Sequence, residues 1–154
     1  MSDWMRQALT EAARVTEQVY PYPGVGVVIV EDGKVVALAR NDKPGEGRHA
    51  EIKAIDEAKT RQADLSRCIL YTNLEPCCNV GLTHSCAEAL IEAKIPEVHV
   101  ALLDPYHLVR GKGIERLQEA GVKVVIGEYA DETRWMLRKY LERFCPSCGW
   151  ALKD

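Results

Sequence analysis

The stretch from Gly24 to Ala39, which reads GVGVVIVEDGKVVALA, decides the fold of this chain. Its first part, Gly24 to Val30, is an apolar and largely β-branched run that is typical of a buried strand. Asp32-Gly33 separates this run from a second one, Lys34 to Ala39, and this dipeptide is a strong signal for a tight hairpin turn. The sequence therefore predicts two antiparallel strands at the start of a sheet.

Helices and strands alternate on either side of this hairpin. Apolar residues at helical spacing predict an amphipathic helix over residues 3–19, which Pro21 and Pro23 end. The order of elements predicts one mixed α/β sheet with helices on both faces, and the helix between the last two strands makes that pair parallel. The elements predicted after the hairpin are a helix from His49 to Lys59, a strand from Cys68 to Leu74, a helix from Cys86 to Lys94, a strand from Val98 to Leu103, a helix over Ile114, Leu117 and Ala120, a strand from Val122 to Ile126, and a last helix over Met136, Leu137, Tyr140, Leu141 and Phe144.

Length and composition fit an ordinary globular protein of 154 residues, so we expect a single domain over residues 1–154 with a short Cys-x2-Cys tail at 145–154. The net charge of -3 gives no bulk basic surface for nucleic acid. The longest apolar run, Val25 to Val30, is too short to span a bilayer, and the first residues do not resemble a secretory signal. We therefore expect a cytoplasmic protein without membrane association, whose six cysteines are thiols or metal ligands.

Two short stretches carry the chemical groups of a catalytic zinc site. They are His49-Ala50-Glu51 and Pro76-Cys77, the latter followed after an eight-residue spacer by Cys86. One imidazole and two thiols would supply three protein ligands and leave a fourth position open, while Glu51 offers a general acid and base. Because His49 and Cys86 each open a predicted helix, two helix N-termini would face one site and favour negative charge there.

Neither stretch is specific alone, because His-x-Glu is common by chance and buried structural cysteines are frequent. Their joint occurrence, at the start of a helix and directly after a strand, favours a catalytic metal site over a structural zinc or chance thiols. Cys78 could replace Cys77 on the metal, although the Pro-Cys order favours Cys77. Gly111-Lys112-Gly113 opens a predicted helix and either holds an anion or forms a close-packed turn. Cys145 and Cys148 are a packed or redox-exposed pair, or ligands completed across a subunit interface.

The chain carries six short motifs, which are Pro23 to Val28, His49-Ala50-Glu51, Leu74-Glu75-Pro76-Cys77, Gly81 with Thr83 and Cys86, Asp104-Pro105, and Gly111 to Ile114. On these motifs the chain resembles the cytidine deaminase superfamily over about residues 4 to 128, and most of all the deaminase domain of the bifunctional riboflavin-biosynthesis deaminase/reductases. The resemblance implies a three-layer α/β/α fold, cytidine-deaminase-like, with a five-stranded mixed sheet in the order 2-1-3-4-5. It also implies one Zn2+ per chain on His49, Cys77 and Cys86, Glu51 as proton shuttle, and a homo-oligomer, either a dimer or a tetramer.

The residues expected to contact the substrate depart from the riboflavin-pathway pattern. Leu82 replaces a basic residue suited to a substrate phosphate, and we expect the reductase domain to be absent. Tyr22 and Tyr106 could stack on a substrate ring, or could only pack the rim of the pocket. The other departures are Asn41 or Asp42 in place of His, Cys78-Asn79 in place of Ser-His, and His84-Ser85 in place of Pro-Pro. The candidate substrate-binding residues are thus Tyr22, Asn41, Asn79, Leu82, His84, Asp104 and Tyr106.

These features together predict a zinc-dependent hydrolytic deaminase that releases ammonia from an amino-substituted pyrimidine- or purine-like small molecule, with an altered substrate shell. Glu51 would take a proton from a zinc-activated water and deliver protons to a ring nitrogen and then to the leaving amine. One alternative is a deaminase of a base in nucleic acid, which the acidic net charge disfavours. The other is a non-catalytic, zinc-stabilised binding module, which Glu51 disfavours because no carboxylate is needed to hold the metal.

Overall fold

The computed structural model describes residues 3–42, 49–78, 85–105 and 110–144. None of the helices in these segments combines the length and the apolar character needed to cross a bilayer. In chain order the elements are α1 (Trp4–Ala13), α2 (Thr16–Val19), β1 (Gly26–Glu31), β2 (Lys34–Arg40), α3 (Ala50–Thr60), the 3-10 turn η1 (Leu65–Arg67), β3 (Cys68–Leu74), α4 (Cys86–Glu92), β4 (Glu97–Leu102), α5 (Lys112–Glu119), β5 (Lys123–Ile126), α6 (Ala130–Met136) and α7 (Arg138–Phe144).

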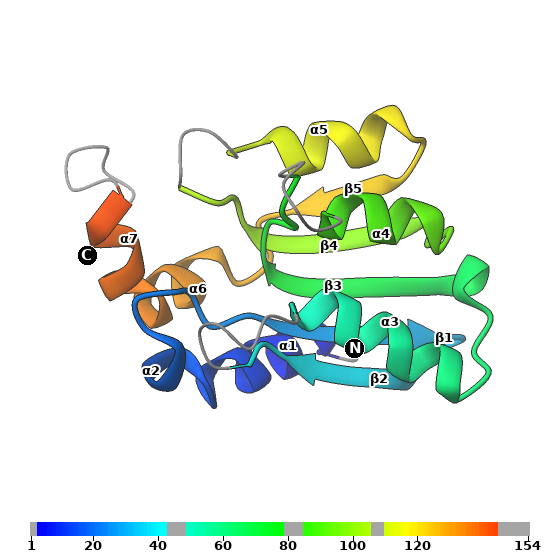
Figure 1. Cartoon of the computed structure of the whole chain (residues 1–154), viewed down its shortest axis with the longest axis horizontal. Helices are drawn as coiled ribbons and strands as arrows, with labels where there is room; N and C mark the ends of the chain where they lie inside the picture. Colours follow the sequence, from blue (N-terminus) through cyan, green and yellow to red (C-terminus); the bar gives the residue numbers. More distant parts are fainter. Residues whose placement is uncertain (1–2, 43–48, 79–84, 106–109, 145–154) are drawn as a thin grey trace.

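The strands form one mixed five-stranded sheet in the order β2-β1-β3-β4-β5 (Figure 1). β1 runs antiparallel to β2 and to β3, while β3, β4 and β5 are parallel to one another. Asp32 and Gly33 both adopt positive φ angles, of 48° and 76°, as a type I′ hairpin turn requires. The predicted hairpin, the parallel last pair and the fold class are therefore confirmed.

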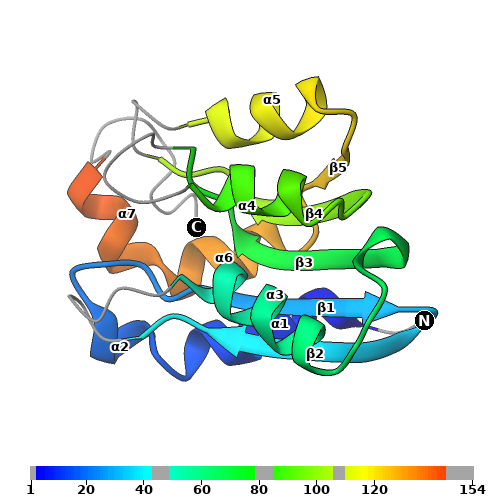
Figure 2. The ribbon, with the colours of Figure 1, turned by 45° about the vertical axis from the view of Figure 1, so that its right-hand side comes forward.

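Helices cover both faces of the sheet, and alternate residues of β1 feed the two cores. Val27 and Ile29 point to a core shared with α3, α4 and α5, while Val28 and Val30 point to a core shared with α1. Figures 1 and 2 show these two helical layers on opposite sides of the strands. Because both faces are covered, β1 reads as a continuous apolar run rather than an alternating one.

The prediction of a single helix over residues 3–19 is wrong, because the structure divides this segment into α1 and α2. The amide of Val15 donates to the carbonyl of Ala12 only three residues back, at 3.2 Å, which tightens the end of α1. The hydroxyl of Thr16 donates to the same carbonyl at 2.8 Å, so the side chain occupies the acceptor that its amide would use in a continuous helix.

A second correction concerns the end of the chain, where one helix was expected and α6 and α7 are found. The sequence pattern does not predict α6, although Asp131 and Glu132 in its first turn suit a helix N-terminus. The apolar spacing continues across the break at Leu137 because Leu137 and Leu141 pack into one cluster with Leu74 at the end of β3. Periodicity therefore indicates the buried face but not the interruption.

Candidate metal centre

Two helix N-termini and the end of a strand carry the predicted ligands. His49 is the N-cap residue of α3, with an extended backbone (φ -68°, ψ 151°), and its side chain makes no capping hydrogen bond. Cys86 is the first residue of α4, which Ser85 caps by accepting a hydrogen bond from the Glu88 amide at 3.2 Å. Cys77 follows β3 by three residues, so the fold brings one ligand from a strand end against two from helix starts.

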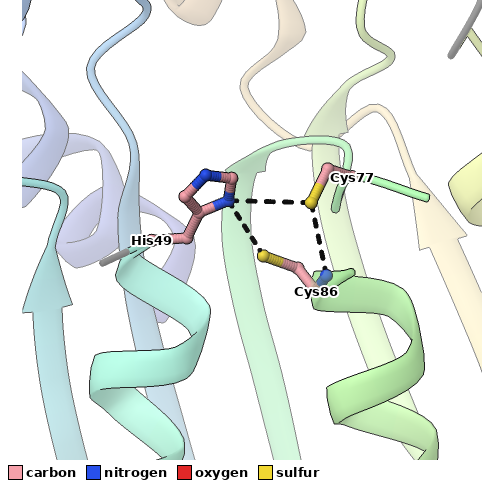
Figure 3. A group of neighbouring side chains, drawn as sticks. All are labelled: His49, Cys77 and Cys86. Carbon is pink, nitrogen blue, oxygen red and sulfur yellow. Dashed lines mark hydrogen bonds between the residues drawn. The ribbon is translucent and has the colours of Figure 1, made fainter. Parts of the chain in front are cut away.

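The three ligand atoms lie together, as Figure 3 shows. His49 Nδ1 is 3.1 Å from Cys86 Sγ and 3.6 Å from Cys77 Sγ. All three ligand atoms lie within 4.8 Å of one another, with His49 exposed, Cys77 half-buried and Cys86 buried. In zinc sites the Zn–S distance is about 2.3 Å and the Zn–N distance about 2.0 Å, so this separation of ligand atoms fits one zinc ion.

Hydrogen bonds divide the charge unequally between the two thiols. The hydrogen bond with the Cys86 side chain lowers the pKa of Cys77 to about 4, and the same bond raises the pKa of Cys86. The Cys86 amide also donates to Cys77 Sγ at 3.2 Å, from the N-terminus of α4. The hydrogen bond with Cys77 raises the pKa of His49 to about 8. These bonds therefore favour the thiolate form at Cys77, which is the form that binds a metal.

Glu51 lies beside this group in the first turn of α3, with only 4% of its surface exposed. Burial raises the pKa of its carboxyl above the ordinary value, and the charge of Cys77 raises it further. Its carboxyl also forms a hydrogen bond with the Cys86 side chain. A buried carboxyl with a raised pKa takes up a proton more readily than an exposed one, which suits a general acid and base.

Cys78 was the alternative to Cys77, and the structure separates their roles. Among the described residues, the group that could hold a metal contains Cys77 and not Cys78. Burial and the charge of Glu75 raise the pKa of Cys78 instead of lowering it. Cys145 and Cys148 lie in the 145–154 tail, which is outside the described residues.

Three of the substrate candidates lie within the described residues. Asn41 spans the two ends of a turn, since its Oδ1 accepts from the Val25 amide and its Nδ2 donates to the Pro23 carbonyl, both at 2.9 Å. Tyr22 is 59% exposed and lines a cavity between α2 and α7. Asp104 accepts a hydrogen bond from the Tyr140 hydroxyl at 3.2 Å. The remaining candidates, Asn79, Leu82, His84 and Tyr106, lie outside the described residues.

Sequence reasoning missed the roles of two buried polar residues, Asn73 near the end of β3 and Glu75 directly after it. Asn73 is fully buried, and its side chain accepts from the Gly26 amide at 2.9 Å and donates to the Gly24 carbonyl at 3.0 Å. Glu75 is 5% exposed, and its carboxylate accepts four backbone amides. The only signal for them in the sequence is a polar residue at the end of an apolar strand, which gives no indication of the partners.

The comparisons with known proteins agree with this site. Residues 1–102 match the family model described as the cytidine and deoxycytidylate deaminase zinc-binding region. The riboflavin biosynthesis protein RibD of Aquifex aeolicus is 39% identical over 132 residues, which are 86% of this chain and 36% of that protein. The chloroplastic riboflavin biosynthesis protein PYRD of Zea mays is 39% identical over 148 residues, which are 96% of this chain and 37% of that protein.

A solved structure gives the same result at the level of the fold. It is a diaminohydroxyphosphoribosylaminopyrimidine deaminase/5-amino-6-(5-phosphoribosylamino)uracil reductase of Thermotoga maritima, with a TM-score of 0.88 and 31% identity over 93% of this chain and 40% of that one. The chain thus spans no more than about two fifths of the length of these relatives. Because residues 1–102 match the zinc-binding region and the His49, Cys77 and Cys86 side chains converge, the chain belongs to the cytidine and deoxycytidylate deaminase family.

Proposed function

We propose that this chain is a zinc-dependent hydrolytic deaminase that releases ammonia from an amino-substituted pyrimidine- or purine-like ring. The observation that carries the proposal is the buried carboxyl of Glu51 in contact with a converging group of one imidazole and two thiols. The printed activity of the Thermotoga maritima relative supports an aminopyrimidine as the first substrate class to test. A non-catalytic zinc site would have no use for a buried carboxyl of this kind.

The chemistry follows from the roles that these side chains can take. His49, Cys77 and Cys86 would hold the metal, and zinc bound there supplies a Lewis acid that lowers the pKa of a water to about 7. Glu51 accepts one proton from the attacking water and donates it to the ring nitrogen beside the carbon under attack. The same carboxylate then passes the second proton to the amine, which leaves as ammonia while the carbon keeps the oxygen as a carbonyl.

Ammonia release by the zinc-loaded protein tests this proposal. The panel contains cytosine, guanine, adenine, their nucleosides and nucleotides, and the phosphoribosylated diaminopyrimidine. Glu51→Gln should reduce turnover of any active substrate by about 100-fold or more, because the proton shuttle is lost. Asp56→Asn is the matched control, because Asp56 is an exposed carboxylate on the same helix, and it should keep the turnover of the parent protein.

The alternatives give different results in the same assay. When RNA and DNA oligonucleotides are added to the panel, turnover of an oligonucleotide and of none of the small molecules would favour a deaminase of bases in nucleic acid. Zinc binding without turnover of any substrate would contradict the proposal and favour a binding module. Full activity of Glu51→Gln would contradict the assignment of the proton shuttle, even if the chain proved to be a deaminase.

A further inference from the structure

The carboxylate of Glu75 joins three segments that are far apart in the sequence. Oε1 accepts from the amide of Asp104 at 3.1 Å and from that of Gly111 at 2.9 Å. Oε2 accepts from the amides of Gly113 at 2.9 Å and Ile114 at 3.2 Å. Because the side chain is buried, water cannot replace these bonds, and each of the four amides depends on this one carboxylate.

Three of the donors belong to the start of α5. Gly111 is its N-cap residue, and Gly113 and Ile114 lie in its first turn. Amides at these positions have no partner within a helix, and the helix dipole favours a negative charge beside them. Of the two alternatives for Gly111-Lys112-Gly113, an anion site or a close-packed turn, the structure shows both, since the anion is the Glu75 side chain and Gly113 packs closely on Pro76.

The same contact places α5 directly against the peptide that precedes a metal ligand. A Cβ atom on Gly113 would lie 2.1 Å from the carbonyl oxygen of Pro76, so only glycine permits this approach. The carbonyl carbon of Pro76 is bonded to the amide nitrogen of Cys77. The position of α5 thus determines where the peptide bond between Pro76 and Cys77 lies.

Cys77 is in turn attached to α4. Its carbonyl accepts from the Ala87 amide at 3.0 Å, and its Sγ accepts from the Cys86 amide at 3.2 Å. On the other side, the Glu75 amide donates to the Leu102 carbonyl at 2.9 Å, which fixes the segment to β4. Glu75-Pro76-Cys77 is therefore a bridge that is held at one end by the carboxylate and at the other by the start of α4.

We propose that Glu75 is a positioning residue, which holds the start of α5 and the end of β4 so that the Cys77 thiolate stays at the metal position. The same bonds fix the backbone of Asp104, a candidate substrate residue, relative to that ligand. Glu75 touches neither the metal ligand atoms nor a substrate in this scheme and acts only through Cys77 and Asp104. The inference rests on the proposed zinc site.

Zinc affinity of Glu75→Gln, measured by competition with a chromogenic chelator, tests this role. The amide NH2 of glutamine cannot accept hydrogen bonds, so two of the four backbone amides lose their partner while the shape of the side chain is kept. We expect a folded protein whose zinc affinity falls about 10- to 100-fold, the range found when groups that orient metal ligands are removed.

Glu88→Gln is the matched control. Glu88 is a half-buried carboxylate on α4 that binds Arg116 of α5, so it ties the same two helices without touching the 75–77 segment. Its zinc affinity should stay within about 2-fold of the parent, below the range for groups that orient ligands. An equal loss in both variants, or the parental affinity in Glu75→Gln, would overturn the proposal.

Two further measurements cover the cases in which the first is not decisive. If Glu75→Gln fails to fold, Gly113→Ala replaces it as the test. The alanine Cβ would displace the Pro76 carbonyl from the side of α5 while Glu75 is kept, so zinc binding should weaken in the same way. Parental zinc affinity of Gly113→Ala would overturn the proposal. If the parent protein binds no zinc, the proposed function fails. Hydrogen exchange then decides the role of Glu75, because Glu75→Gln must lose protection at the Ala87 amide, and unchanged protection there would overturn it.

Discussion

Two asparagine side chains hold the backbone at the start of β1, and they differ in their access to water. Asn73 is fully buried between the amide of Gly26 and the carbonyl of Gly24. Asn41 is half-buried and binds the amide of Val25 and the carbonyl of Pro23. Each asparagine thus accepts from one backbone amide and donates to one backbone carbonyl, but the bonds of Asn73 are buried and water can reach those of Asn41.

Asn73→Ala should reduce the free energy of unfolding by about 3 kcal/mol, because it leaves a buried amide and a buried carbonyl without partners. Asn41→Ala should cost about 1 kcal/mol, since water can replace its side chain. Urea denaturation of the two variants measures both values. Equal losses would show that burial does not decide the strength of this pair.

The grouping of His49, Cys77 and Cys86 could be predicted from the sequence, and the supporting residues could not. These three side chains are chemically distinctive and occur at helix starts and after a strand, and the resemblance favours Cys77 over Cys78. Asn73 and Glu75 act through backbone groups that only the folded sheet brings to them. Asn41 was predicted as a substrate contact because it is polar and precedes the His49 loop, and its amide binds backbone atoms.

At the level of elements, α1 packs on β1 through a position that has no room for a side chain. A Cβ atom on Gly26 would lie 1.9 Å from the Ala8 carbonyl oxygen and 2.6 Å from the Ala12 amide nitrogen. Both neighbours are backbone atoms of α1, so neither can turn aside as a flexible side chain would. The helix can approach the strand this closely only because residue 26 is glycine.

Gly26→Ala should therefore lower the free energy of unfolding by about 3 kcal/mol or more, since α1 must move away from the sheet. Gly121→Ala is the control, because a Cβ there meets nothing within 4 Å and its cost comes from the positive φ of 87°. That cost should be about 1 to 2 kcal/mol. Chemical denaturation compares the two variants, and an equal or smaller loss for Gly26→Ala would contradict this account of the packing.

The alternation of helices and strands could be predicted because continuous β-branched runs indicate buried strands, whereas apolar residues three or four apart indicate helices. The order of the strands came from the resemblance, since the pattern alone gives only the hairpin and the parallel last pair. Helix interruptions could not be predicted, because the break at Thr16 depends on a hydroxyl that binds the Ala12 carbonyl. The break at Leu137 lies within an unbroken apolar stripe that packs on the end of the sheet.

At the scale of the whole molecule, several large apolar side chains of the described residues remain exposed. Ile126, at the end of β5, is 47% exposed, and Trp135 on α6 is 62% exposed. Exposed apolar surface of this kind is commonly covered by self-association. We propose that the chain forms a homo-oligomer that covers these side chains, in keeping with the dimer or tetramer that the resemblance implies.

Light scattering behind size-exclusion chromatography should give a mass of two or four times 17.2 kDa. Trp135→Ser should shift the population toward smaller species, because it removes a large apolar side chain that is 62% exposed. A parent protein that elutes as a single chain at all concentrations would contradict the proposed oligomer. An unchanged mass for Trp135→Ser would exclude this surface from the interface.

The whole account depends on one zinc ion held by one imidazole and two thiolates. The zinc X-ray absorption spectrum of the protein, with the metal content per chain, tests this claim most directly. We predict one zinc per chain with two sulfur ligands at about 2.3 Å and one histidine nitrogen at about 2.0 Å. A protein that binds no zinc, or a spectrum with three sulfur ligands or with none, would contradict the account.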